Sequence, residues 1–158
     1  MSGLVDLDSV DWQILALLQD DATITNKDLA QRVGLSASAC HDRVRRLRTS
    51  GVITRTVVEV DARAVGRPLQ AFVGVQLHPH RRDLVEAFVA AIRQLPETLA
   101  LYNVSGNQDF FVHVVVTDSE HLQRFIIDHL ATRAEVGRTH TYLIYGQPIH
   151  GSIRSLDS

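Results

Sequence analysis

The spacing of apolar residues changes near the middle of this chain. Through the first fifty residues apolar side chains recur every three or four positions, which is the period of helices that bury one face. Beyond residue 70, β-branched and aromatic runs alternate with segments of helical period. The first expected helix runs through residues 12–19, where Ile14 and Leu18 lie one turn apart and Asp8 or Ser9 can cap the start. The pattern therefore predicts a helical unit followed by a unit of mixed strands and helices.

Residues 25–55 have the pattern of two short helices joined by a glycine turn. Thr25 can cap the first helix, and Asp28 three residues later completes a capping-box pattern. Gly34 stands where a left-handed residue would end this helix, and Ser36 can cap the next one. A helix–turn–helix that reads the major groove of DNA needs a recognition helix with one apolar and one polar, cationic face. The apolar positions are Cys40, Val44 and Leu47, and the polar positions are Ser38, His41, Asp42, Arg45 and Arg46.

Positive charge gathers on this segment, although the whole chain has a formal net charge of −2. Six arginines and one acid stand between residues 31 and 58, which is the footprint expected of a site-specific DNA binder. Arg45 and Arg46 are the leading candidates for base or phosphate contact, whereas a structural ion pair explains Arg43 equally well. Asp42 can accept from cytosine or orient a neighbouring arginine, and Arg55 can touch a phosphate or simply lie exposed. The candidate DNA-contacting residues are Ser36, Ser38, His41, Asp42, Arg43, Arg45, Arg46 and Arg55.

The region after this helix predicts a strand and a linker. The β-branched residues 52–60 favour a strand or wing. Residues 61–69 contain Gly66 and Pro68 and read as a linker. We therefore expect a helix–turn–helix domain with its wing or linking strand in residues 1–60, a linker at 61–69 and a second domain in residues 70–158.

The second domain has the element order of a ferredoxin-like sandwich, β-α-β-β-α-β. The expected strands are 71–78, 99–105, 110–116 and 139–146, and the expected helices lie over 81–95 and after residue 118. The fold class is accordingly α+β, with an N-terminal winged helix–turn–helix and a C-terminal ferredoxin-like domain. Because strand 110–116 is apolar on both faces, the sheet face without helices needs a cover, and dimerisation is the economical one.

Three segments carry a resemblance to a known family. They are VDWQILALLQ, LAQRVGLSASACHDRVRRLRTSGVI and VSGNQDFFVHV, and the middle one is the longest and most specific. Over residues 5–149 the chain resembles the Lrp/AsnC (leucine-responsive, feast/famine) transcription regulators of bacteria and archaea. The resemblance implies an N-terminal DNA-binding domain, a linking strand, and a C-terminal domain for oligomerisation and amino-acid sensing. It also implies dimers that assemble into tetramers, octamers or hexadecamers and bind a palindromic or near-palindromic operator in double-stranded DNA.

The resemblance further implies an effector site at the turn between the second and third strands of the sensor domain, at an interface between dimers. An amino acid's ammonium needs an acceptor, which Asp109 or a backbone carbonyl can supply, and its carboxylate needs donors, which the backbone around Gly106 can supply. Asn107 and Gln108 favour a polar effector over leucine. A structural hairpin turn is the competing interpretation. The candidate residues are Ser105, Gly106, Asn107, Gln108 and Asp109, with Tyr142, Leu143 and Ile144 of the last strand as weaker ones.

Other functional classes find little support in the sequence. There is no P-loop, dinucleotide fingerprint or Ser/His/Asp order, and the eight histidines include no pair with the spacing of a helical metal site. The main alternative is a catalytic relative such as the sirohaem decarboxylases, which share this architecture, but His113 is better explained as a sheet histidine. A stand-alone sensor module would not need the first sixty residues. We expect no catalytic residue, metal or cofactor, a small core role for the single cysteine, Cys40, no membrane span or signal peptide, and a cytoplasmic, nucleoid-associated protein.

Overall fold

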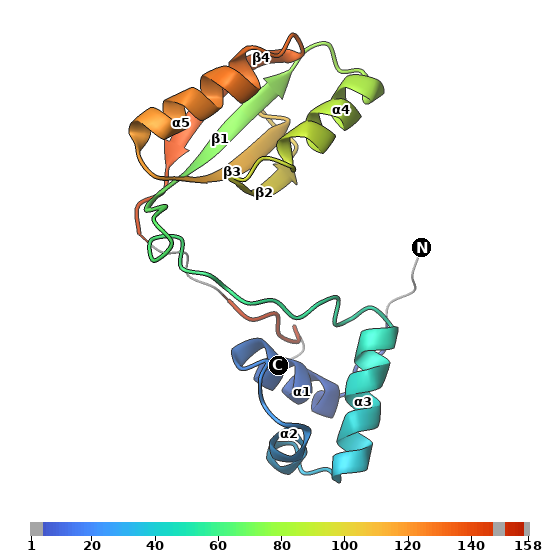
Figure 1. Ribbon diagram of the computed structural model, residues 1–158. Coiled ribbons are helices and arrows are strands. Elements are labelled where there is room, and N and C mark those ends of the chain that lie inside the picture. Colours follow the sequence, from blue (N-terminus) through green and yellow to red (C-terminus); the bar gives the residue numbers. More distant parts are fainter. Residues whose placement is uncertain (1–4, 147–150, 157–158) are drawn as a thin grey trace. The chain divides into compact units, whose positions relative to one another are not determined.

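The computed structural model describes residues 5–146 and 151–156 (Figure 1). The chain divides into two compact units, Met1–Val58 with Ile149–Ser158, and Glu59–Pro148. The last described residues, 151–156, thus group with the helical unit, whereas the sequence prediction placed them in the second domain. Gln19 accounts for this grouping, because its side-chain amide donates to the Ile153 carbonyl at 3.0 Å and accepts from the Ile153 N–H at 2.9 Å. None of the described helices has the length and apolar content to cross a membrane.

The first unit contains the three helices that the sequence predicts, each begun by a side-chain cap. The helices are α1 (Ser9–Asp20), α2 (Asn26–Arg32) and α3 (Ala37–Thr49). Asp8, Thr25 and Ser36 each accept a hydrogen bond from a backbone N–H of the first turn, which satisfies a donor that has no partner inside the helix. Gly34, with φ of 69°, makes the turn between α2 and α3 in a conformation that other residues rarely adopt. The buried core of this unit is Ile14, Leu29, Ala30, Val33, Cys40 and Leu47.

Residues 52–60, where the sequence predicts a strand or wing, form no β-strand in the described part of the chain. The valines of this segment are solvent-accessible, and Val58 is 87% exposed. β-branched residues favour strands through packing against neighbours and cross-strand partners, and this segment has no partner strand within the described residues. The composition was typical of a strand, but composition alone cannot supply the partner.

The second unit is the predicted ferredoxin-like domain, with a four-stranded antiparallel sheet in the order β2-β3-β1-β4. The last strand occupies residues 136–143 and not the predicted 139–146, because its pairing with β1 ends at Ala71 opposite Leu143. The elements are β1 (Leu69–Leu77), α4 (Arg82–Ile92), β2 (Thr98–Asn103), β3 (Phe110–Val116), α5 (Ser119–Ile126), a π-helical turn η1 (Ile127–Ala131) and β4 (Val136–Leu143).

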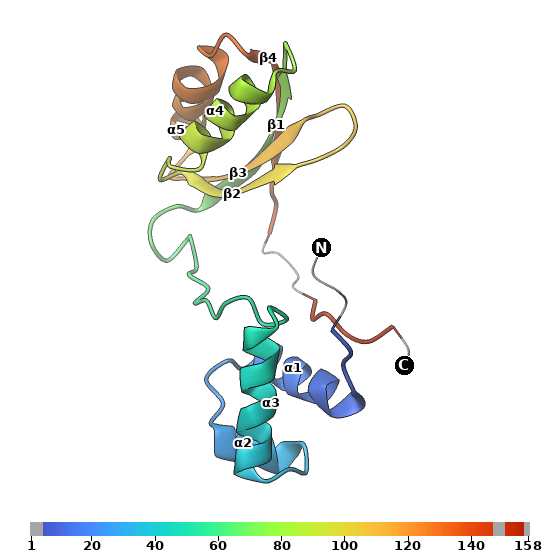
Figure 2. The ribbon, with the colours of Figure 1, turned by 90° about the vertical axis from the view of Figure 1, so that its right-hand side faces the viewer.

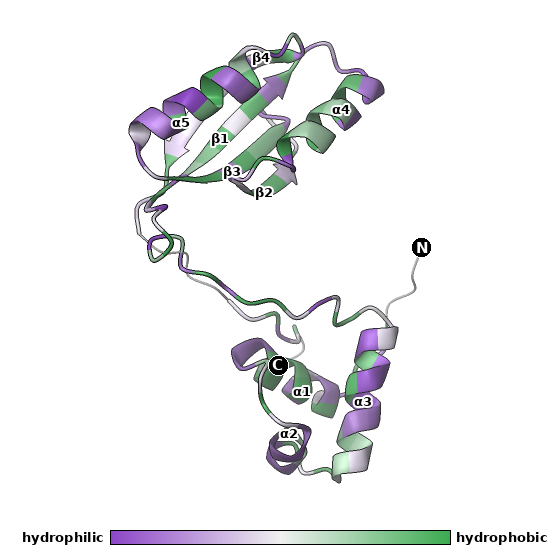
Figure 3. Cartoon of the chain, viewed as in Figure 1, coloured by the Kyte–Doolittle hydropathy of each residue, from purple (hydrophilic) through white to green (hydrophobic). Residues whose placement is uncertain are grey.

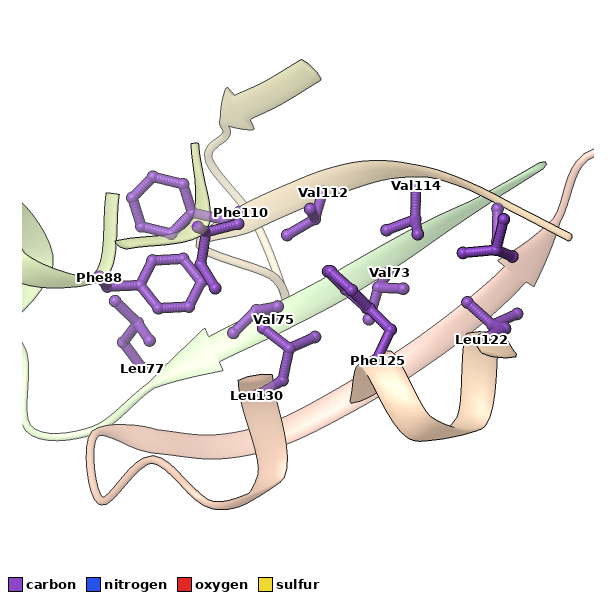
Figure 4. Close-up of a cluster of buried hydrophobic side chains, with 13 residues drawn as sticks. Val73, Val75, Leu77, Phe88, Phe110, Val112, Val114, Leu122, Phe125 and Leu130 are labelled. Carbon is purple, nitrogen blue, oxygen red and sulfur yellow. The ribbon is translucent and has the colours of Figure 1, made fainter. Parts of the chain in front are cut away.

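The core of this unit lies between the sheet and its two helices. Figure 2 shows α4 and α5 on the same side of the sheet. Alternate residues of β1 and β3 point toward the helices, and Figure 4 shows them packed against Phe88 of α4, and Leu122 and Phe125 of α5. The strand residues in this core include Val73, Val75, Phe110, Val112 and Val114.

No helix of the described residues covers the opposite face of the sheet, which is rich in aromatic rings. Phe72 of β1 lies with its ring centroid 6.1 Å from that of Phe111 and 6.2 Å from that of Tyr102. Phe111 in turn lies 5.9 Å from Tyr142 of β4. Such an apolar, uncovered sheet face is typical of a surface that packs against another protein surface.

Candidate DNA-binding face and effector pocket

Recognition helix α3 presents most of the predicted DNA-contacting residues to solvent. Figure 3 shows the helix as largely hydrophilic with short hydrophobic bands. Cys40 and Leu47 of the same helix are fully buried, and burial raises the pKa of the Cys40 thiol, as expected for a core cysteine. The exposed candidates are Ser36, Ser38, His41, Asp42, Arg45 and Arg46 on or next to α3, and Arg55 beyond it. The structure therefore gathers seven of the eight candidates in exposed positions and leaves Arg43 half-buried.

Arg43 and Arg46 both bind a buried carboxylate at the start of α1. Asp11 is fully buried, and its Oδ1 atom accepts from Arg43 Nη1 at 3.0 Å, while Oδ2 pairs with Arg46 Nη2. Arg43 Nη1 also lies 2.6 Å from Asp8 Oδ2. This carboxylate of Asp8 raises the pKa of Arg43, and the Asp11 N–H together with Arg43 lowers the pKa of Asp8. These ion pairs fasten the middle of α3 to the N-terminus of α1.

Asp8 and Asp11 also form a capping box, which explains the acidic start of α1. The Asp11 N–H donates to Asp8 at 2.8 Å, and the Asp8 N–H donates to Asp11 at 3.2 Å. Among the described residues there is no group of three or more His, Cys, Asp or Glu that could hold a metal ion. The sequence predicted the helix-start role of these acids, but the contact with α3 joins positions more than thirty residues apart and has no local signal.

Arg45 differs from Arg43 and Arg46 because its one ion-pair partner among the described residues, Asp42, lies on the surface. Its guanidinium lies 3.0 Å from Asp42, and the side chains of Arg45 and Asp42 are 68% and 64% exposed. Exposed pairs of this kind contribute about 0–1 kcal/mol, so a phosphate or a base edge can displace Asp42 at little cost. Asp42 pairs with Arg45 in the structure, and its contact with a cytosine stays a prediction.

A pocket of about 630 Å³ opens beside the β2–β3 turn on the helix-free face of the sheet. Its size lies within the range of small-molecule sites. Four of the predicted effector residues line it: Ser105, Asn107, Gln108 and Tyr142. Within the described chain, Gly106, Asp109, Leu143 and Ile144 are not among its lining residues. The remaining lining residues, which sequence reasoning missed, are Gln76, Val104, Phe111, Arg138 and His140.

The missed residues reach the pocket through the register of three strands. Gln76 of β1 stands opposite Arg138 of β4, and Gly74 stands opposite His140, so that alternate positions of both strands face the pocket. Gln76 also donates from its side-chain amide to the Asn107 carbonyl, which ties β1 to the turn. Such positions can be recognised only when the pairing of β1 with β4 is known.

Gln108 is the most buried polar residue in the pocket wall. Only 8% of it is exposed, and its Nε2 atom lies 3.1 Å from Nδ1 of His140. Its Oε1 atom is buried without a hydrogen-bond partner among the described residues. A Cβ at Gly74 would lie 3.0 Å from the Gln108 side chain, so the glycine makes room for this amide. A buried oxygen without a hydrogen bond lowers stability by about 1–3 kcal/mol, and a hydrogen-bond donor removes this penalty.

Asp109 has structural partners outside the pocket lining. Its Oδ2 atom accepts from the Leu77 N–H at 2.7 Å, and its Oδ1 atom lies 3.6 Å from Nε2 of His80. Its own N–H donates to the Val75 carbonyl at 2.9 Å. These bonds hold the β2–β3 turn against the end of β1. Contact between Asp109 and an effector therefore stays a prediction, and the structure adds a role in positioning the turn.

His113 lies on the helix-free face, in the strand where the sequence suggested a satisfied sheet histidine. Its Nε2 atom lies 3.0 Å from Oε1 of Gln70, and its ring packs against Phe72 with centroids 4.8 Å apart. Burial lowers the pKa of this imidazole. The residue is accordingly a neutral, hydrogen-bonded part of the sheet.

Comparisons with known proteins assign a family to each of the two units. Residues 7–54 match a winged helix–turn–helix DNA-binding family, and residues 70–153 match the Lrp/AsnC ligand binding domain. The chain is 41% identical over 140 residues to the HTH-type transcriptional regulator AldR of Mycolicibacterium smegmatis, covering 89% of this chain and 82% of that protein. It is 38% identical over 143 residues to the leucine-responsive regulatory protein of Rhizobium meliloti, covering 90% and 92%.

A solved structure has the same fold over nearly its whole length. A transcriptional regulator from Neisseria meningitidis, in complex with L-methionine, superposes with a TM-score of 0.87 at 29% identity, covering 94% of this chain and 96% of that one. The relatives named here are transcriptional regulators, which favours a regulator over the decarboxylase alternative. With its capped recognition helix, its ferredoxin-like domain and these relatives, the chain belongs to the Lrp/AsnC family and is a DNA-binding transcriptional regulator that carries a ligand-binding domain.

Proposed function

We propose that this protein binds a specific operator through α3 and that an amino acid bound in the pocket beside the β2–β3 turn changes its DNA affinity or assembly. The proposed DNA binding rests on one observation, which is that the arginines of α3 have different environments. Asp11 anchors Arg43 and Arg46, while Arg45, Ser38 and His41 face solvent in positions suited to reach a major groove. The Arg46 side chain is 47% exposed although it pairs with Asp11, so it can also reach a phosphate.

The working form of the protein is a dimer or a multiple of dimers. The aromatic, helix-free face of the sheet and the exposed, β-branched residues 54–60 both support this proposal, because both are surfaces that partners commonly cover. Two copies of α3 spaced by one turn of DNA, about 34 Å, would read a palindromic or near-palindromic operator. Such a protein acts on the chromosome in the cytoplasm.

The effector part is supported by the chemistry of the pocket. Phe111 and Tyr142 supply apolar surface, and the amides of Gln76, Asn107 and Gln108 supply donors and acceptors. The related Neisseria regulator has been solved in complex with L-methionine, so a member of this fold can hold an amino acid. No catalytic step is needed for this role, and none is proposed.

Selection from random duplex DNA tests the proposed function directly. The full-length protein is expected to enrich one sequence with two-fold symmetry and half-sites about one helical turn apart. A titration of the selected operator with each of the twenty amino acids should then change its apparent affinity for at least one of them. Enrichment of no sequence would contradict the DNA part, and an operator affinity that no amino acid alters would contradict the effector part.

A further inference from the structure

The charge of the pocket wall points to the class of effector. Of the nine residues that line the pocket in the described chain, none is an aspartate or glutamate. Arg138 is the permanent charge among them, and it projects from β4 opposite Gln76. The remaining polar groups are neutral amides, hydroxyls and an imidazole. A ligand that enters this pocket therefore meets a positive charge that the wall itself does not neutralise.

Arg138 also has no carboxylate partner among the described residues, in contrast to other arginines of the same domain. Arg133 lies 2.7 Å from Glu135, and Arg124 lies 2.8 Å from Glu120. A guanidinium presents a planar fork of donors that matches a carboxylate. The unpaired guanidinium of Arg138 is thus available for a ligand carboxylate, in a pocket where no acid of the protein competes for it.

An α-amino acid carries one carboxylate and one ammonium, and the turn can accommodate both. Ser105 and Asn107 are exposed residues of the lining, and their side-chain oxygens can accept from an ammonium. Ser105 and Asn107 line the pocket on either side of Gly106, and their backbone N–H groups can donate to the α-carboxylate. With these two groups satisfied at the turn, Arg138 remains for a group on the ligand's side chain.

We propose that Arg138 makes the pocket selective for amino acids with an acidic side chain, glutamate and aspartate. This inference rests on the proposed function, because it specifies the effector of the same site. Phe111 and Tyr142 pack against the methylene stem, and Arg138 binds the side-chain carboxylate. Lysine or arginine as ligand would place a second positive charge beside Arg138 and is excluded. Glutamine, which has the shape of glutamate without its charge, binds more weakly because it loses a charge-assisted bond.

Calorimetric titration of the full-length protein at fixed ionic strength tests the inference. We expect glutamate or aspartate to bind at least about tenfold more tightly than the corresponding amide, the ratio that a charged hydrogen bond confers. Arg138→Gln should bring the ratio of glutamate to glutamine affinity close to one. Arg138→Glu should favour lysine over glutamate. The matched control is Arg93→Gln, an exposed arginine after α4, which should leave all ratios unchanged.

Two outcomes would overturn the inference, and they separate it from the proposed function. If a neutral amino acid binds more tightly than glutamate and Arg138→Gln leaves that ranking unchanged, the pocket senses amino acids but Arg138 does not set the class. If no amino acid binds the wild-type protein while it still recognises its operator, the effector part of the proposed function fails as well. Thermal unfolding of each variant establishes that it is folded before its affinities are compared.

Discussion

The buried carboxylate of Asp11 holds the recognition helix in place, and its removal should destabilise the first unit more than the removal of any other acid nearby. Asp11→Ala deletes the acceptor of Arg43 and Arg46 and one half of the capping box with Asp8. Breaking a fully buried ion pair costs about 3–5 kcal/mol. Here the arginine side chains are 30% and 47% exposed and can be rehydrated, which lowers the cost. Adding the lost capping bond, we expect the free energy of unfolding to fall by about 3 kcal/mol.

Urea unfolding followed by the fluorescence of Trp12 measures this change. Trp12 is the single tryptophan of the chain and lies in α1, so its signal reports on the first unit. With a urea dependence of about 1.5 kcal/mol per molar, the midpoint should shift downward by about 2 M. Asp11→Asn, which keeps the volume and one acceptor but not the charge, should lie between the wild type and Asp11→Ala.

The matched control is Asp6→Ala, an exposed acid in the segment before α1. It should leave the midpoint within experimental error, because exposed substitutions away from caps and ion pairs cost little. If Asp11→Ala shifts the midpoint no more than Asp6→Ala, the ion pairs do not hold α3, and the distinction between Arg43 and Arg45 loses its basis.

Two further predictions concern the second unit. Gly74→Ala places a Cβ 3.0 Å from the Gln108 side chain and should weaken effector binding about tenfold. The control is Gly137→Ala, whose Cβ would meet atoms no nearer than 3.6 Å and which should leave the affinity unchanged. Equal affinities of the two variants by calorimetry would refute the tight packing of Gln108 against Gly74. Because burial lowers the pKa of His113 below its ordinary 6.5, the stabilisation from the neutral imidazole is complete above pH 6.5 and is lost as the pH falls through the lowered value. Urea unfolding followed by circular dichroism should show this loss in the wild type and a smaller one in His113→Gln, and identical pH profiles would contradict it.

The helical unit could be predicted from sequence because its signals are local. Asp8, Thr25 and Ser36 each precede an apolar-periodic run, and a cap depends only on residues within one turn. The anchoring of α3 could not be predicted in the same way. Asp11 contacts Arg43 across more than thirty positions, and nothing in the spacing of either residue indicates the other.

In the sheet and the pocket, too, local features could be predicted from the sequence and long-range contacts could not. The order of strands and the turn that carries Gln108 followed from periodicity and from the family resemblance. Residues 52–60 had the composition of a strand but lack a partner strand within the described chain. Arg138 and His140 join the pocket through the register of β4 against β1, which a single sequence does not specify.

The central claim is that α3 separates anchoring arginines from a reading arginine, and the salt dependence of operator affinity tests it most directly. Each phosphate contact that is lost reduces the slope of log affinity against log salt concentration by about 0.9, and a lost base contact costs about 1–3 kcal/mol of discrimination. Arg45→Ala should therefore weaken operator binding and either flatten the slope or relax the sequence preference, with the urea midpoint unchanged. Arg43→Ala should lower the midpoint and leave the slope of the folded protein as in the wild type. An Arg45→Ala protein with wild-type affinity, slope and sequence preference would contradict the account.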